Sequence, residues 1–146
     1  MFTLTFSYFN SNSFQIVVFL GRYPAADVAF LLGSSPRTTP QTWTAFQTFA
    51  KTVVDTLGAS PDGVRYSAVA FNSEPRVVFR FNTLQGPQYT QDNVKQRIDE
   101  MRYTQGATRI DKAVDLANNV LFKPESGARK DVPQVSGLYI ITRNNL

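Results

Sequence analysis

The chain has 146 residues, a length typical of one domain, and 42% of its residues are hydrophobic and 18% charged. It contains no cysteine and no histidine. Disulfides, thiolate metal sites and cysteine catalysis are therefore excluded, and the commonest general base near neutral pH is missing. The net charge is +4, from 15 basic and 11 acidic residues scattered along the sequence. Because a nucleic-acid site needs basic residues gathered on one face, we expect no nucleic-acid partner.

Residues 1–22 form an atypical leader. An apolar stretch from Phe14 to Leu20 follows sequence rich in serine and asparagine. A signal peptide needs basic residues before such a stretch and a small-x-small cleavage site after it, and the sequence fits neither requirement well. The stretch is also too short to span a membrane. Three interpretations stay open for the leader: a poor signal peptide, an additional β-strand, or sequence foreign to the domain that residues 23–146 form.

The first regular elements after the leader are a strand and a long helix. The continuous apolar run from Asp27 to Leu32 predicts a strand that is covered on both faces, as in a parallel sheet. Thr39 and Pro40 are typical of an N-cap and a first helical residue, and Gly58 is placed to end the helix. The residues between them with helical spacing predict a core-facing stripe: Trp43, Phe46, Phe49, Ala50, Val53, Val54 and Leu57.

A β-hairpin is predicted next. Two strand patterns, Val64–Phe71 and Arg76–Phe81, flank a turn at residues 72–75 that contains asparagine, serine and proline. Strict alternation in the second strand predicts that its larger apolar side chains share one face of the sheet: Val77, Phe79 and Phe81.

Two further helices and a last strand complete the pattern. A helix is predicted over Thr90–Arg102, then a tight loop at residues 106–108, a helix that continues through Phe122, a polar connection at residues 124–133 and a strand at Leu138–Thr142. This alternation predicts an α/β fold with a mostly parallel sheet and one antiparallel edge strand. The third helix is expected to face inward with Ile110, Ala113, Val114, Ala117, Val120 and Leu121.

Five segments, in this order along the chain, resemble the von Willebrand factor type A family, and most closely its matrix-type members, such as those in type VI collagen chains. The resemblance implies a Rossmann-like three-layer α/β sandwich. It also implies further strands after the last predicted one, so residues 23–146 are expected to be a partial domain that lacks the C-terminal strands. The five segments are residues 26–32, 46–57, 64–71, 106–114 and 138–142.

The family's cation site is expected to be degenerate here. The family's metal-ion-dependent adhesion site (MIDAS) combines an Asp-x-Ser-x-Ser loop with a threonine and a second aspartate. At the matching positions this chain has Gly33, Ser35, Arg37, Thr108 and Arg143. Magnesium prefers oxygen ligands that include carboxylate, and two guanidinium groups should repel it. We therefore expect that the magnesium site is lost and that the chain holds no metal and no other cofactor.

The resemblance implies a non-catalytic module for protein binding or adhesion, secreted into the extracellular matrix. Its expected partner is a matrix or cell-surface protein, bound through an acidic side chain by Ser35, Arg37, Thr108 and Arg143. An alternative is an incomplete gene product or fragment without binding activity of its own. A less favoured alternative is a phosphate- or nucleotide-binding α/β enzyme. The sequence contains no phosphate-binding loop motif and no Gly-x-Ser-x-Gly motif, and no residue is predicted to be catalytic.

Overall fold

The structure is a computed structural model that describes residues 25–34, 36 and 38–139. The order of the sheet is β3-β2-β1-β4; β1 runs parallel to β2 and β4, and β3 runs antiparallel to β2. This arrangement confirms the mostly parallel sheet with one antiparallel edge strand. The regular elements are β1 (Ala26–Gly33), α1 (Pro40–Leu57), β2 (Val64–Phe71), β3 (Pro75–Phe79), the 3-10 turn η1 (Gly86–Gln88), α2 (Gln91–Asp99), α3 (Ile110–Leu116), the π-helical turn η2 (Ala117–Leu121), the 3-10 turn η3 (Pro124–Ser126) and β4 (Gln134–Tyr139).

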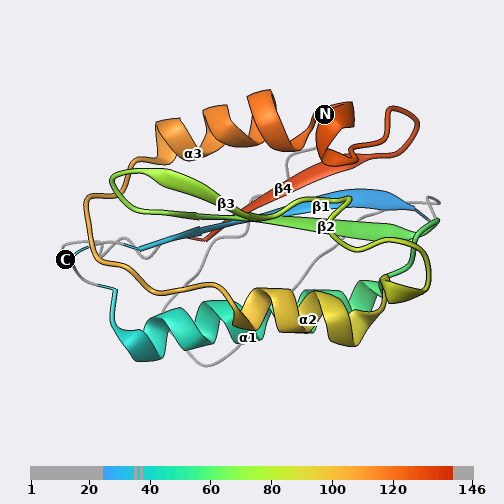
Figure 1. Ribbon diagram of the computed structural model, residues 1–146. Helices are drawn as coiled ribbons and strands as arrows, with labels where there is room; N and C mark the ends of the chain where they lie inside the picture. Colours follow the sequence, from blue (N-terminus) through green and yellow to red (C-terminus); the bar gives the residue numbers. More distant parts are fainter. Residues whose placement is uncertain (1–24, 35, 37, 140–146) are drawn as a thin grey trace.

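Three layers form around this sheet. Helices α1 and α2 cover one face, and α3 covers the other (Figure 1). Alternate residues of β1 enter two separate hydrophobic clusters, with Val28 and Phe30 on the side of α1 and α2, and Ala29 and Leu31 on the side of α3. Strand β1 is buried along its whole length, which explains its continuous apolar sequence.

The ends of α1 lie where the sequence predicts them. The Thr39 hydroxyl accepts a hydrogen bond from the Thr42 backbone N–H at 3.2 Å, and Pro40 follows as the first helical residue. Gly58 ends the helix with φ of 78°, a left-handed value that favours glycine. These two caps set the ends of α1, the helix that connects β1 to β2.

The hairpin of β2 and β3 is confirmed, but the predicted alternation in β3 is wrong. Ala68 pairs with Phe79 and the next residue, Val69, pairs with Val77, so Val78 is an extra residue in the ladder. Such a β-bulge turns the side chains on either side of it to opposite faces. Phe79 therefore packs with α1 and α2, whereas Val77 packs on the side of α3.

The third helix also departs from its prediction. Its buried stripe consists of Ala113, Ala117 and Leu121, whereas Ile110 and Val114 are each 39% exposed. The two alanines, one turn apart, face the sheet. Ile110 and Val114, each three positions before one of these alanines, therefore lie beside the buried stripe and stay partly exposed. The helix widens at its end, where the Phe122 N–H bonds the Ala117 carbonyl oxygen at 2.9 Å.

The last strand begins earlier than predicted. Strand β4 starts at Gln134 rather than at Leu138, because its first residues pair with β1 although they are polar or small. The part of the predicted strand after Tyr139 lies outside the described residues, as does the predicted leader at residues 1–22. None of the helices in the described part of the chain is long and apolar enough to cross a membrane.

Candidate functional site

The loops at the carboxyl ends of β1 and β2 meet the linker before α3 at one end of the sheet (Figure 1, left). The Thr108 hydroxyl donates a hydrogen bond to the Ser34 backbone oxygen at 3.3 Å. This contact places Thr108 beside the loop after β1. The other predicted site residues, Ser35, Arg37 and Arg143, lie outside the described residues.

Ser34 anchors the loop after β1. Its backbone N–H donates to the Phe71 carbonyl oxygen at 2.9 Å, and its hydroxyl makes a short hydrogen bond to the Thr104 carbonyl oxygen. The residue is 1% exposed. The Ser34 hydroxyl thus joins β1 to the linker between α2 and α3, and its proton is committed to a backbone acceptor.

Asn72, at the end of β2, makes a second set of neutral contacts to the same linker. Its side-chain amide donates to the Thr104 hydroxyl at 2.8 Å, and its backbone oxygen accepts from the Arg109 N–H at 3.0 Å. The neighbouring Ser73 hydroxyl accepts from the Ala107 N–H at 3.1 Å. The sequence marks residues 72–75 as a turn, but nothing in the pattern indicates that this turn binds the linker.

Gly33 stands where the family has its first aspartate. A Cβ at this position would lie 2.6 Å from Cζ of the buried Phe71 ring, so a side chain here requires the ring to shift. Within residues 25–34, 36 and 38–139, no group of three or more acidic side chains could hold a metal ion. The described donors are hydroxyls and amides bonded to one another, and they do not fit a divalent cation that prefers carboxylate.

An exposed ion pair lies beside these loops. The Arg109 guanidinium donates to both carboxylate oxygens of Asp111, at 2.9 and 2.6 Å. These hydrogen bonds lower the pKa of Asp111 to about 2. The Lys112 ammonium also forms a short ion pair with Glu74, so both acids near the site are already paired with bases.

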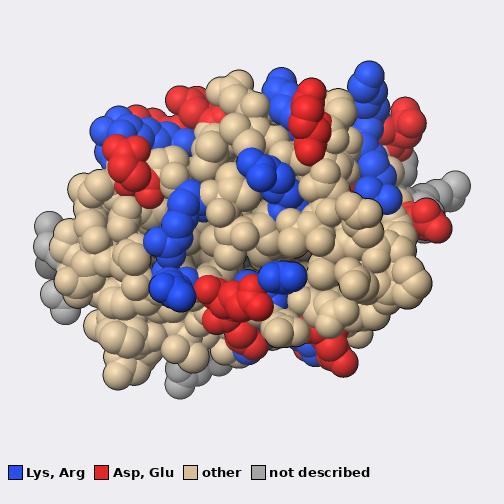
Figure 2. All heavy atoms as spheres, in the orientation of Figure 1, with Lys and Arg blue, Asp and Glu red and all other residues tan. Residues whose placement is uncertain are grey.

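Charges of both signs also occur together elsewhere on the surface. Figure 2 shows basic and acidic side chains next to one another on the face in view, with no single basic field. Between α1 and α2, a groove of about 490 Å³ is crossed by two ion pairs, Lys51 with Asp99 at 2.7 Å and Lys95 with Asp55 at 2.8 Å. The hydrogen bond to Asp55 raises the pKa of Lys95. Both lysines of this groove are paired with carboxylates within the chain.

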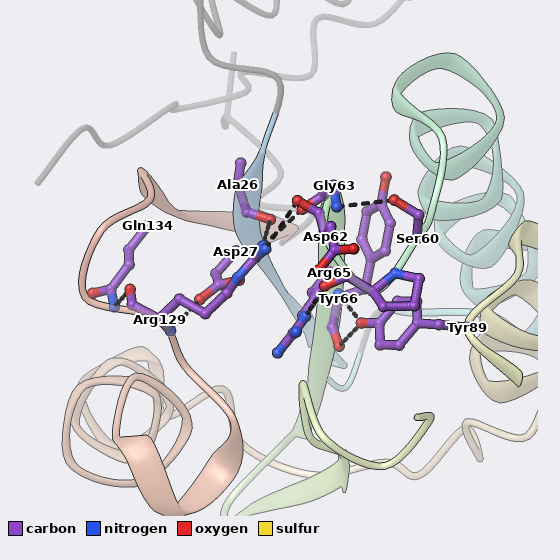
Figure 3. Close-up of polar contacts among 11 residues, drawn as sticks. Ala26, Asp27, Ser60, Asp62, Gly63, Arg65, Tyr66, Tyr89, Arg129 and Gln134 are labelled. Carbon is purple, nitrogen blue, oxygen red and sulfur yellow. Dashed lines mark hydrogen bonds and ion pairs between the residues drawn. The ribbon is translucent and has the colours of Figure 1, made fainter. Parts of the chain in front are cut away.

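The opposite end of the sheet holds a buried ion pair that sequence reasoning missed (Figure 3). The Asp27 side chain is fully buried, and its Oδ1 accepts from Nε and Nη2 of Arg129 at 2.9 and 2.7 Å. The Arg129 backbone N–H donates to the other oxygen at 2.6 Å, and Nη2 also donates to the carbonyl oxygens of Ala26 and Gly63. The only sequence signal was an acid inside an apolar run.

Two tyrosines lie near this ion pair (Figure 3). The Tyr89 hydroxyl accepts from the Tyr66 backbone N–H at 2.6 Å and donates to the Tyr66 carbonyl oxygen at 3.4 Å. Strand β3 pairs with β2 only from Ala68 onward, so this hydroxyl takes the place of a strand at Tyr66. Burial raises the pKa of Tyr89 to about 12 and raises the pKa of Tyr66 as well.

The fold and these segments agree with a known family. Residues 27–143 match the model of the von Willebrand factor type A domain, so the chain belongs to this family. Among similar proteins, von Willebrand factor A domain-containing protein 1 of Mus musculus is 31% identical over 112 residues, which are 77% of this chain and 26% of the relative. Von Willebrand factor A domain-containing protein 2 of Homo sapiens is 34% identical over 119 residues, 81% of this chain and 15% of the relative. The collagen alpha-6(VI) chain of Homo sapiens is 27% identical over 107 residues, 73% of this chain and 4% of the relative.

Solved structures show the same fold. Proximal thread matrix protein 1 from the mussel byssus superposes with a TM-score of 0.74 at 19% identity, over 85% of this chain and 32% of that one. A second structure of that protein, described with a zinc-occupied MIDAS motif, gives 0.68 at 22% identity, over 82% of this chain and 29% of that one. The chain thus spans a third or less of the length of each of these proteins.

Proposed function

We propose that this chain is a non-catalytic protein-binding module of extracellular-matrix type that binds its partner without a divalent cation. The observation that carries the proposal is the pair of replacements in a member of this family: Gly33 and Arg143 stand where the family has aspartates. The matrix proteins among its relatives support an extracellular location. The family's interaction role supports a partner that is a protein.

The proposed contact is a salt bridge between the chain and an acidic side chain of the partner. Arg37 and Arg143 replace neutral or acidic family positions with guanidinium groups, which bind carboxylate in a planar, two-pronged geometry. Ser35 and Thr108 would add hydroxyl groups. The neutral hydrogen bonds of Ser34 and Asn72 support this role, because they hold the neighbouring loops together without a metal.

Metal independence is tested by a thermal melt followed by circular dichroism, with millimolar magnesium chloride and with sodium chloride of equal ionic strength. A ligand that binds only the folded state raises the melting temperature. We expect a cooperative melt with the same midpoint in both salts. A midpoint that rises specifically with magnesium would overturn the proposal, and a melt without cooperativity would favour a fragment with no binding activity.

The arginine contact is tested by NMR titration of the labelled chain with a short, capped peptide that contains one glutamate. The same peptide with glutamine is the control ligand. We expect the glutamate peptide to bind to the unmodified chain, and we expect Arg143→Ala to weaken this binding at least threefold. Lys130→Ala, an exposed basic residue at the other end of the sheet, should leave binding unchanged. Equal losses in the two variants would indicate a general charge effect and contradict the proposed site.

A further inference from the structure

Two exposed arginines lie next to each other near the candidate site. Arg76 belongs to the edge strand β3, whereas Arg102 belongs to the linker between α2 and α3. The Arg76 guanidinium donates a hydrogen bond to the Arg102 backbone oxygen at 2.7 Å. This bond holds two positively charged residues, 26 positions apart in the sequence, on one surface.

This surface adjoins the contact between Asn72 and Thr104, which ties the end of β2 to the linker at the candidate site. Arg76 follows Asn72 by four positions, and Arg102 precedes Thr104 by two. Because an extended chain rises about 3.4 Å per residue, the backbone of each arginine lies within about 14 Å of this contact. One extended segment of a partner could therefore reach both the candidate site and the two arginines.

The chain does not neutralise these two charges. The structure describes all 11 acidic residues of the sequence, and none of these acids forms an ion pair with either arginine. The acids two positions before the arginines are already paired with other bases, Glu74 with Lys112 and Glu100 with Arg97. Two like charges on one surface repel each other, and a negatively charged ligand relieves this repulsion.

We propose that Arg76 and Arg102 bind a second acidic side chain of the partner, next to the acidic side chain bound at the candidate site. This proposal rests on the proposed function and describes the partner more closely. The partner would present a segment with two acidic residues about three positions apart, which is roughly 10 Å in an extended chain. Guanidinium groups suit this contact, because their N–H donors bind a carboxylate in a planar, two-pronged geometry.

Two short, capped peptides test this surface by NMR titration of the labelled chain at low ionic strength, where exposed charges are least screened. The first peptide contains two glutamates three positions apart, and in the second peptide one of these glutamates is glutamine. We expect the two-glutamate peptide to bind the unmodified chain at least fivefold more tightly. We also expect the Nε–H signals of Arg76 and Arg102 to shift more with this peptide. Equal affinities for the two peptides, or no binding of either, would overturn the proposal.

A charge-removing variant tests whether the gain comes from this surface. Arg102→Gln removes one charge and keeps the backbone oxygen that Arg76 contacts. We expect it to weaken binding of the two-glutamate peptide at least threefold more than binding of the one-glutamate peptide. Lys130→Gln is the matched control, because Lys130 is exposed and basic but lies at the other end of the sheet. The same losses in both variants would indicate a general charge effect and refute the surface.

Arg143→Ala separates this proposal from the proposed function. We expect Arg143→Ala to weaken binding of both peptides by a similar factor, because both contain the glutamate for the candidate site. If Arg143→Ala changes neither affinity while Arg102→Gln weakens the two-glutamate peptide, the arginine contact of the proposed function fails and the surface of Arg76 and Arg102 stands. If only Arg143→Ala weakens binding, the candidate site stands and this surface fails.

Discussion

Two arginine–aspartate pairs lie at opposite ends of this sheet and differ in their surroundings. Arg129 and Asp27 form a pair in which the carboxylate is fully buried, whereas the carboxylate of the Arg109–Asp111 pair is 61% exposed. In the buried pair the guanidinium also bonds backbone oxygens of β1 and of the turn before β2. In the exposed pair the guanidinium hydrogen bonds go to the Asp111 carboxylate. The comparison teaches that the surroundings of an ion pair decide how much it contributes to the free energy of unfolding.

The largest effect is expected from Arg129→Met. The substitution leaves the Asp27 carboxylate buried without its partner, and breaking a buried pair in this way costs about 3–5 kcal/mol of unfolding free energy. Urea denaturation measures it. The matched control is Arg97→Met, which removes a half-exposed pair between α2 and its C-cap residue Glu100 and should cost less than about 1 kcal/mol. Similar losses in both variants would show that burial does not distinguish these pairs.

A smaller loss is expected from Tyr89→Phe, also at the buried end. The substitution removes the hydroxyl that bonds both backbone groups of Tyr66, and leaving buried groups unpaired costs about 1–3 kcal/mol. The measurement is urea denaturation at neutral pH. An unchanged midpoint would mean that another group or water replaces the hydroxyl.

The same tyrosine predicts how stability depends on pH. The unfolded chain loses a tyrosine proton near pH 10, whereas folded Tyr89 holds its proton until about pH 12. Above about pH 10 the unfolded state therefore binds fewer protons, and stability falls as the pH rises. We expect a shallower fall in Tyr89→Phe than in the unmodified chain, because one of the two buried tyrosines is gone. Denaturation between pH 8 and 11 measures both slopes, and identical slopes would contradict the prediction.

The smallest effect is expected from Arg109→Gln at the exposed end. In the unmodified chain the Asp111 carboxyl should titrate near pH 2, and in the variant its pKa should rise towards the ordinary value of about 3.9. Because the folded pKa is the lower one, any stability from this pair is present above about pH 4 and is lost as the pH falls towards 2. NMR titration of the carboxyl measures the pKa. A stability loss at pH 7 as large as that of Arg129→Met would remove the contrast between the two ends.

The fold could be predicted because most of its elements carry their own local signals. The caps of α1 at Thr39 and Gly58, and the turn at residues 72–75, act within a few residues of sequence. The bulge at Val78 and the exposure of Val114 depend on how whole elements pack, so periodicity alone gave the wrong face. The early start of β4 depends on pairing with β1, which its polar first residues do not indicate.

Less of the candidate site could be predicted. The resemblance placed Thr108 beside the loop after β1, where its hydroxyl donates to the Ser34 backbone oxygen. Its part in binding stays a prediction. The bonds of Ser34 and Asn72 to Thr104 were missed, because serine and asparagine are ordinary loop residues and their partners lie over 30 positions away. The pairing of Asp27 with Arg129 spans 102 positions, and no local pattern connects the two. The roles of Ser35, Arg37 and Arg143 remain predictions.

The hydroxyl of Tyr89 has a consequence for assembly. Edge-to-edge association of sheets becomes an open-ended polymer only if both sides of each copy accept a strand. On one side, Pro75 and Arg76 protect β3, and the Tyr89 hydroxyl occupies the backbone groups of Tyr66 where β3 no longer covers β2. Strand addition on this side is therefore blocked both at β3 and at the part of β2 that β3 leaves uncovered. Contacts between sheet edges that need this side of each copy could not propagate into a fibre.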